Sequence, residues 1–113
     1  MLAKINRLTS KKDFALVKMK GKVFQEKTFA LAVLDRGEGD SRFGFVISTK
    51  ISKRAVKRNK AKRLLRAVIQ KKIKIIKKGY DVVFLAKAGV LDLDNNQAGE
   101  EVGRALKSAG LFV

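Results

Sequence analysis

The side chains with the clearest chemical potential in this sequence are lysines and arginines, and they are concentrated in one stretch. Residues 50–78 hold 14 of the 27 Lys and Arg residues and contain no Asp or Glu. Cations at this density bind polyanions, through charge and, for arginine, through paired hydrogen bonds to phosphate. The chain has no histidine and no cysteine, so it lacks the commonest general base, the commonest metal ligand and every thiol. Binding of an anionic partner is therefore the chemistry to expect.

These cations need a rigid support, and the spacing of the apolar residues among them predicts one long helix. At 100° per residue one broad face holds Ala61, Leu64, Leu65, Val68, Ile75 and Ile76, with Ile69 at its edge, and the opposite side holds Asn59, Lys62, Arg63, Arg66, Gln70 and Lys74. Ser52 is the expected N-cap, and Gly79 the expected residue at which the chain leaves the helix. Arg58, Lys62 and Arg66 repeat at i, i+4, where like charges cost about 0.2–0.5 kcal/mol per pair. A sequence that keeps this repulsion indicates an anionic partner that relieves it.

The composition of the whole chain indicates one small folded domain, residues 1–113. It is 46% hydrophobic, enough for a modest core, and contains no proline. The formal net charge of +17 indicates nucleic acid or another acidic surface as the partner. No apolar run approaches the roughly 20 residues that span a bilayer, and the N-terminus lacks the apolar core of a signal peptide. We therefore expect a cytoplasmic protein that does not associate with membranes.

The segments around the basic helix are expected to form a sheet and two further helices. A short helix begins at Ser10 and ends at Gly21, with Phe14, Val17 and, as a further candidate, Leu16 on its apolar side. Strands are predicted at 28–34, 42–49 and 80–86, with a possible short extended piece at 23–24 and a turn at 35–41. The core-facing residues expected in the first two strands are Phe29, Leu31, Val33, Phe43, Phe45 and Ile47.

The last predicted helix runs to about residue 108, is capped by Asn95 or Asn96, and turns Val102, Leu106 and Ala109 inward. The order is then α-β-β-α-β-α. A basic helix between two strands implies that those strands are parallel. The sequence thus predicts an α+β fold of two layers with a mixed sheet.

The spacing of the basic motif resembles that of a known family, the bacterial ribonuclease P protein component. The resemblance rests on Arg42-Phe43-Gly44, then Lys50, then Arg58-Asn59-Lys60-Ala61-Lys62-Arg63-Leu64-Leu65-Arg66. It extends to residues 8–14, which look like the family's L-x-x-x-x-D-F element, and to residues 80–95, which look like its last strand and turn. Lys60 stands where the motif usually has arginine, and Lys18 where several members carry a second aromatic residue.

The resemblance implies a function and a fold. Family members are small basic subunits that bind a large catalytic RNA, and the holoenzyme removes the 5′ leader of precursor tRNA. The RNA carries the active site and its Mg²⁺ ions, so the chain would be a subunit of an endoribonuclease without catalytic or metal-binding side chains of its own. The implied fold is an α/β sandwich with a left-handed crossover through the basic helix, although about 98% of such crossovers are right-handed. The free protein is expected to be a monomer.

The resemblance also implies two sets of binding residues. The set for the catalytic RNA is Lys53, Arg54, Lys57, Arg58, Asn59, Lys60, Lys62, Arg63 and Arg66. The set for the leader lines a cleft between the first helix and the sheet: Phe14, Lys18, Arg42, Val46, Ser48 and Lys50.

Simpler interpretations compete with each of these signals. The basic stretch could be a solvated face, a calmodulin target or a membrane-surface helix. Phe14 alone would be a core residue as readily as a stacking platform. Asp92 and Asp94 fit a solvated turn better than a metal pair, because no third ligand accompanies them.

Two other function classes also remain as alternatives, a noncatalytic RNA-binding module such as a ribosomal protein and a nuclease with its own active site. The lack of His, Cys and clustered carboxylates argues against the nuclease.

Overall fold

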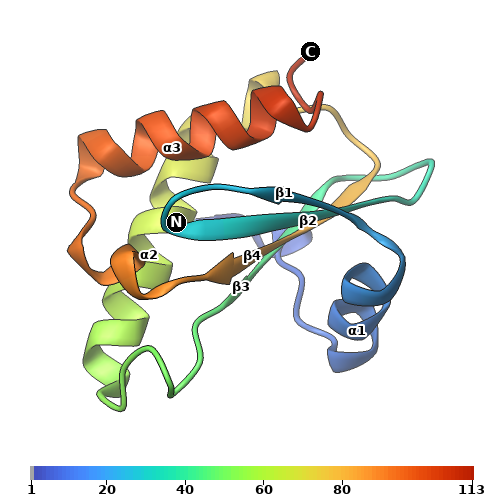
Figure 1. Ribbon diagram of the computed structural model, residues 1–113. Coiled ribbons are helices and arrows are strands. Elements are labelled where there is room, and N and C mark those ends of the chain that lie inside the picture. Colours follow the sequence, from blue (N-terminus) through green and yellow to red (C-terminus); the bar gives the residue numbers. More distant parts are fainter. Residues whose placement is uncertain (1) are drawn as a thin grey trace.

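The computed structural model describes residues 2–113 and shows a four-stranded sheet with helices on both faces (Figure 1). The helices are α1 (Lys11–Lys20), α2 (Ala55–Lys72) and α3 (Asn95–Ser108), with short 3₁₀ turns η1 (Lys4–Asn6), η2 (Ile73–Ile75) and η3 (Ala88–Asp92). The strands are β1 (Lys22–Gln25), β2 (Phe29–Asp35), β3 (Arg42–Val46) and β4 (Tyr80–Ala86). The predicted α+β class is confirmed. No helix of residues 2–113 combines the length and apolar character needed to cross a bilayer.

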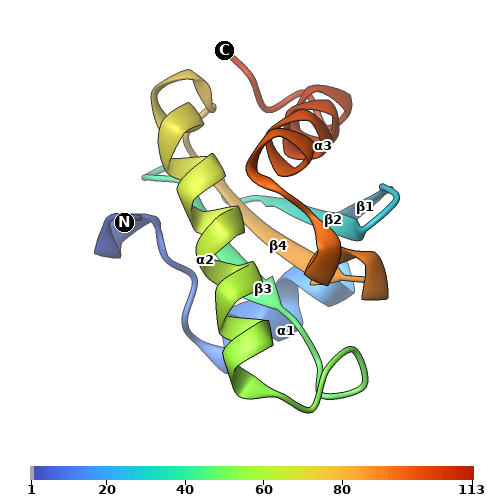
Figure 2. The same ribbon diagram turned by 90° about the vertical axis from the view of Figure 1, so that its left-hand side faces the viewer.

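The sheet is mixed, as predicted. Its strand order is β1-β2-β4-β3, in which β1/β2 and β2/β4 are antiparallel and β3/β4 are parallel. Helix α2 connects the two parallel strands. Figure 2 has α2 in front of the sheet. When that view is turned so that the parallel strands β3 and β4 point upward, β4 lies to the left of β3, so the crossover is left-handed. The short extended piece around Val23 is strand β1 at one edge, and β3 forms the other edge.

The two faces of the sheet bury different sets of residues because side chains alternate along each strand. Helices α2 and α3 cover the face that carries the main core, in which Phe84 packs between Phe29 and Phe45, with ring centroids 5.1 Å apart in both pairs. Helix α1 covers only part of the opposite face, where Val17 packs on Ala32 and Val83. No helix of residues 2–113 covers the rest of that face (Figure 1).

The predicted ends of α2 were wrong at both termini. The N-cap is Arg54, because the Ser52 hydroxyl accepts a hydrogen bond from the Arg54 N–H, 3.2 Å away, before the helix begins. The helix ends at Lys72, and Ile76 is buried in an extended bridge to Phe112 instead of on the helix face. Ile75 is 50% exposed.

Smaller corrections apply elsewhere. Strand β3 ends at Val46, three residues before the predicted end. Helix α3 is capped by Asp94 rather than by either asparagine, in a capping box with Gln97. In α1 the predicted start at Ser10 is confirmed, since the Ser10 hydroxyl caps the helix by accepting from the Asp13 N–H, but Leu16 is 40% exposed.

Candidate nucleic-acid interface

The cations of α2 fall on three sides of the helix. Asn59 and Arg63 lie on the outer crest and are exposed. Lys62 and Arg66 lie on the flank next to the edge strand β3. Lys57 and Lys60 lie on the opposite flank, beside η3 and the start of α3. The nine predicted RNA-binding residues thus encircle the solvent side of α2, with Lys53 and Arg54 exposed just before its first turn.

Two arginines of this set are held in place by the protein itself. Arg58 Nη1 donates a hydrogen bond to the Ser52 carbonyl at 2.8 Å, at the start of the helix. The Arg66 guanidinium lies over the Phe45 ring, 5.7 Å from its centroid, a distance at which cation–π attraction is significant. Both side chains are therefore preorganised, whereas Arg63 is exposed and makes no hydrogen bond or ion pair with another described side chain.

Phe14 occupies the junction between α1 and β3. Its ring lies directly on Gly44, where a Cβ would fall 2.5 Å from Phe14 Cε1. On one side of the ring is a shallow depression of about 290 Å³, lined by Lys11, Phe14, Ala15, Lys18 and Val46. Three residues of the predicted leader cleft, Phe14, Lys18 and Val46, are thus brought together.

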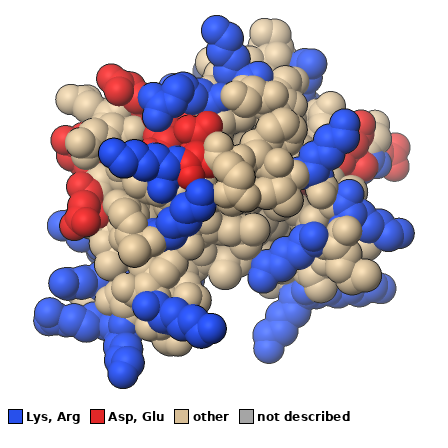
Figure 3. Space-filling view, in the orientation of Figure 1, with Lys and Arg blue, Asp and Glu red and all other residues tan. Residues whose placement is uncertain are grey.

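A second depression, of about 170 Å³, lies on the other side of the same ring. Arg7, Lys62 and Arg66 contribute its cations, together with Phe14 and the β3 backbone region around Phe45. Phe14 is therefore the shared wall between the open sheet face and the β3 flank of α2. In the space-filling view, Lys and Arg side chains gather over α1 and over the start of α2, on either side of a hollow beneath the sheet (Figure 3).

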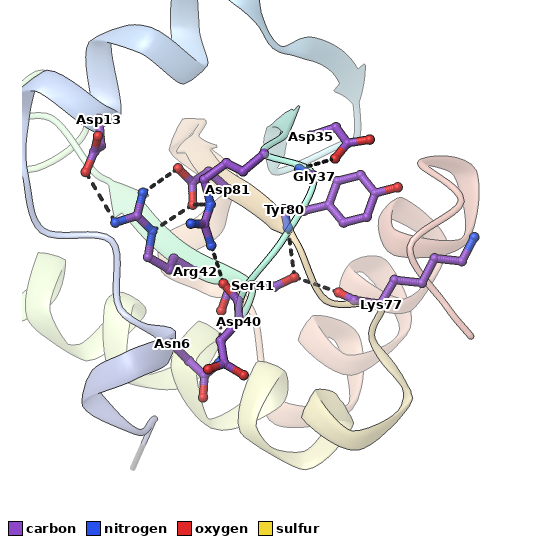
Figure 4. A network of polar contacts seen from close by, with 11 residues as sticks. Asn6, Asp13, Asp35, Gly37, Asp40, Ser41, Arg42, Lys77, Tyr80 and Asp81 are labelled. Carbon is purple, nitrogen blue, oxygen red and sulfur yellow. Dashed lines mark hydrogen bonds and ion pairs between the residues drawn. The ribbon is translucent and has the colours of Figure 1, made fainter.

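The remaining predicted cleft residues are placed differently. Arg42 does not line either depression: its Nε and Nη2 donate to the two carboxylate oxygens of Asp81, at 2.8 and 2.7 Å, and its Nη1 lies 3.3 Å from Asp13 of α1 (Figure 4). The hydrogen bonds to Asp81, with the charges of Asp81 and Asp13, raise the pKa of Arg42 above its already high ordinary value. Ser48 and Lys50 are exposed on the loop after β3, outside both depressions.

Sequence reasoning missed two cations that belong with Phe14. Lys11 lies one helical turn before Phe14 in α1, and the spacing 11, 14, 15 and 18 would have grouped the four residues of that helix that line the first depression. Arg7 was not signalled by any motif. It reaches this place because it pairs with Phe43 at the edge of β3 and donates from Nε to the Leu2 carbonyl at 2.9 Å.

Metal-ligating side chains do not cluster in the part of the chain that the structure describes. Within residues 2–113 no three Asp or Glu residues come close enough together to hold a metal ion. The described residues around α2 and Phe14 thus form a cationic surface, and the described carboxylates do not group into a metal-ion site.

Comparison with known proteins agrees with this surface. The sequence profile described as Ribonuclease P matches residues 2–110. The chain is 36% identical to the ribonuclease P protein component of Pelotomaculum thermopropionicum, over 90% of each chain, and 35% identical to that of Synechocystis, over 98% of this chain and 90% of that protein.

Solved structures give the same result. The RNase P protein of Staphylococcus aureus superposes with a TM-score of 0.86 at 27% identity, covering 97% of this chain and 100% of that one. The RNase P protein from Thermotoga maritima superposes with a TM-score of 0.81 at 29% identity, covering 90% and 96%. The chain therefore belongs to the ribonuclease P protein family, whose members are protein subunits of an endoribonuclease.

Proposed function

We propose that this protein binds the catalytic RNA of ribonuclease P through the solvent side of α2 and the 5′ leader of precursor tRNA at Phe14. In this way it supports Mg²⁺-dependent removal of the leader. The observation that carries the proposal is the position of the Phe14 ring, which lies between the cations Lys11 and Lys18 on one side and Lys62 and Arg66 on the other.

The arrangement at Phe14 suits a single strand better than a duplex. Single-stranded RNA is bound by a basic track along its backbone and by stacking of bases on aromatic rings, worth about 1–3 kcal/mol per base. Stacking tolerates any base, so it suits a leader whose sequence varies between tRNAs. The exposed cations on the crest of α2 carry no aromatic residue among them and suit the phosphates of folded RNA.

The chemistry in this proposal belongs to the RNA. The protein has no histidine or cysteine, and its described carboxylates do not form a metal site. Mg²⁺ is accordingly assigned to the RNA subunit, and the protein's residues hold and orient the two RNA molecules. The proposal includes a free protein that is monomeric and acts in the cytoplasm.

Cleavage assays test the division of labour. Precursor tRNA is incubated with the protein, with a cognate catalytic RNA, or with both, in the presence of Mg²⁺. We expect no cleavage by the protein alone and efficient leader removal by the mixture. Cleavage by RNA-free protein would overturn the proposal in favour of a protein nuclease, and no effect of the protein on the RNA's activity would favour an unrelated RNA-binding module.

Substitutions test the two surfaces. Arg63→Ala or Arg66→Ala should weaken assembly with the catalytic RNA for every substrate; Arg63 is the cleaner choice because Arg66 also lies beside Phe14. Phe14→Ala should leave assembly intact and weaken the binding of precursor tRNA, with little effect on mature tRNA. Phe112→Ala is a matched control, because Phe112 is also half-buried but packs against the main core. If folded Phe14→Ala loses affinity for precursor and mature tRNA equally, Phe14 has a purely structural role.

A further inference from the structure

A groove runs between α2 and α3 on the flank of α2 opposite Phe14. Of its lining residues, the proposed function assigns only Lys57 and Lys60 to RNA binding. It consists of two adjoining depressions of about 610 and 620 Å³, which share Leu64 and Asn95. At 100° per residue, its lining residues lie about half a turn around α2 from Lys62 and Arg66. The crest that bears Asn59 and Arg63 separates it from the leader cleft.

The α2 wall of this groove is a row of lysines. Lys57, Lys60, Lys71 and Lys72 line it, over about 22 Å of helix at 1.5 Å per residue. Within residues 2–113 no carboxylate oxygen lies within 4.0 Å of any of their ammonium groups. The wall therefore presents four cations without a direct ion pair, although Asp92, Asp94 and Glu100 also line the groove and reduce its net charge.

The α3 wall is low and carries hydrogen-bonding groups. Gly99 and Gly103 face the groove; a Cβ at Gly99 would meet nothing within 4 Å, and one at Gly103 would meet only Lys72 Nζ at 4.0 Å. Glycine weakens a helix relative to alanine, and no contact with another described residue requires it at either position. Beside these glycines the wall offers the side chains of Asn95, Asn96 and Glu100. The missing side chains leave room for a ligand against α3.

We propose that this groove binds a helical segment of the catalytic RNA, with phosphates toward the lysines of α2 and 2′-hydroxyls toward α3. The proposal rests on the proposed function. RNA helices are recognised through phosphates and 2′-hydroxyls across their shallow minor groove, and a 2′-hydroxyl can donate to the acceptors of the α3 wall, carboxylates included. No aromatic residue lines the groove, which argues against a single strand held by stacking.

Filling the groove without changing its charge is the sharpest test. Gly99→Leu places a side chain in open space and improves helix propensity, so the melting temperature should stay equal or rise. We expect the affinity for the catalytic RNA to fall at least tenfold, while the ratio of precursor to mature tRNA affinity in the assembled holoenzyme is unchanged. Ser108→Leu, at an exposed position of α3 outside the groove, is the matched control. Folded Gly99→Leu that binds the RNA as tightly as the wild type would overturn the proposal.

The lysine row provides a second test that does not depend on how Gly99→Leu folds. In Lys71→Ala/Lys72→Ala the slope of log K for the catalytic RNA against log salt should become shallower by about 1–2, because each phosphate contact contributes about 0.9. Lys107→Ala on the exposed part of α3 should leave the slope unchanged. An unchanged slope in the double variant would overturn the groove proposal alone. Failure of the wild-type protein to bind the catalytic RNA would instead contradict the proposed function.

Discussion

The ring of Phe14 and the backbone of Gly44 are in direct contact across the boundary between α1 and β3. A Cβ at position 44 would lie 2.5 Å from Phe14 Cε1, closer than side chains tolerate, and 3.3 Å from Leu8 Cβ, which is a tight contact. The glycine of the R-x-G strand is thus what allows the outer edge of the Phe14 ring to approach the β3 backbone. This contact forms the wall between the two basic depressions.

Gly44→Ala is predicted to displace the Phe14 ring and with it the stacking surface. Overpacking of this kind costs typically about 1–3 kcal/mol of folding free energy. We expect a lower urea midpoint and a reduced preference of the holoenzyme for precursor over mature tRNA. Combining it with Phe14→Ala removes the clash, so the double variant should be less destabilised than the sum of the two single changes. Strict additivity in urea unfolding would show that the two residues do not interact.

Asp81 is predicted to be the charged residue on which stability depends most. Its side chain is 4% exposed and accepts from Arg42, and its Oδ1 lies 2.8 Å from Arg36 Nε. Removing one partner of a buried ion pair costs up to about 3–5 kcal/mol. Because both arginines are 28% exposed and can regain water, we expect Asp81→Asn to cost about 2–3 kcal/mol.

The control for that change is Asp13→Asn. Asp13 meets the same Arg42 at 3.3 Å but is 30% exposed, so its loss should cost less than about 1 kcal/mol. Both values come from urea unfolding followed by circular dichroism. If the two variants were equally stable, the buried part of the network would contribute nothing beyond a surface ion pair.

The sequence predicted the elements of this fold better than their ends, and α2 shows why. Helical periodicity located its buried residues, and Ala61, Leu65 and Val68 are all buried. The same periodicity predicted a helix that is too long, because the segment after Lys72 pairs with the C-terminal residues. The Lys77 N–H donates to the Leu111 carbonyl at 2.7 Å, and the Val113 N–H donates to the Ile75 carbonyl at 2.8 Å. Such long-range pairing leaves no mark on local hydrophobic spacing.

In the candidate site, too, local spacing located residues but could not show contacts between residues distant in the sequence. Local spacing placed Phe14 and Lys18 on one helix and the cations on another. Arg42 was assigned by motif alone, and its partner Asp81 lies 39 residues away in the sequence, so no local pattern could show that its guanidinium is engaged within the protein. The left-handed crossover likewise came from family resemblance, since strand twist by itself favours the opposite hand.

Arg66 is predicted to be less replaceable by lysine than Arg63. The Arg66 guanidinium lies over Phe45, and a lysine there would keep the charge but lose the planar group that stacks and forms paired hydrogen bonds to phosphate. Arg63 is exposed and does not lie over an aromatic ring of the described residues. We expect Arg66→Lys to weaken catalytic-RNA binding several-fold and Arg63→Lys by less than about twofold, as measured by filter binding at fixed salt. The reverse order would show that preorganisation by Phe45 does not contribute to binding.

Salt should separate the electrostatic part of substrate binding from the stacking part. Phosphate contacts release counterions, so log K falls linearly with log salt, and about six contacts would lower affinity by roughly three decades between 50 and 200 mM. Stacking on Phe14 releases no counterion. Phe14→Ala should therefore shift the line for precursor tRNA downward without changing its slope, whereas Lys18→Ala should make it shallower by about 0.7, the value for one phosphate of a single strand. The titration is run at constant Mg²⁺, which competes for the same phosphates. A change of slope in Phe14→Ala would mean that the ring positions the neighbouring lysines instead of stacking on a base.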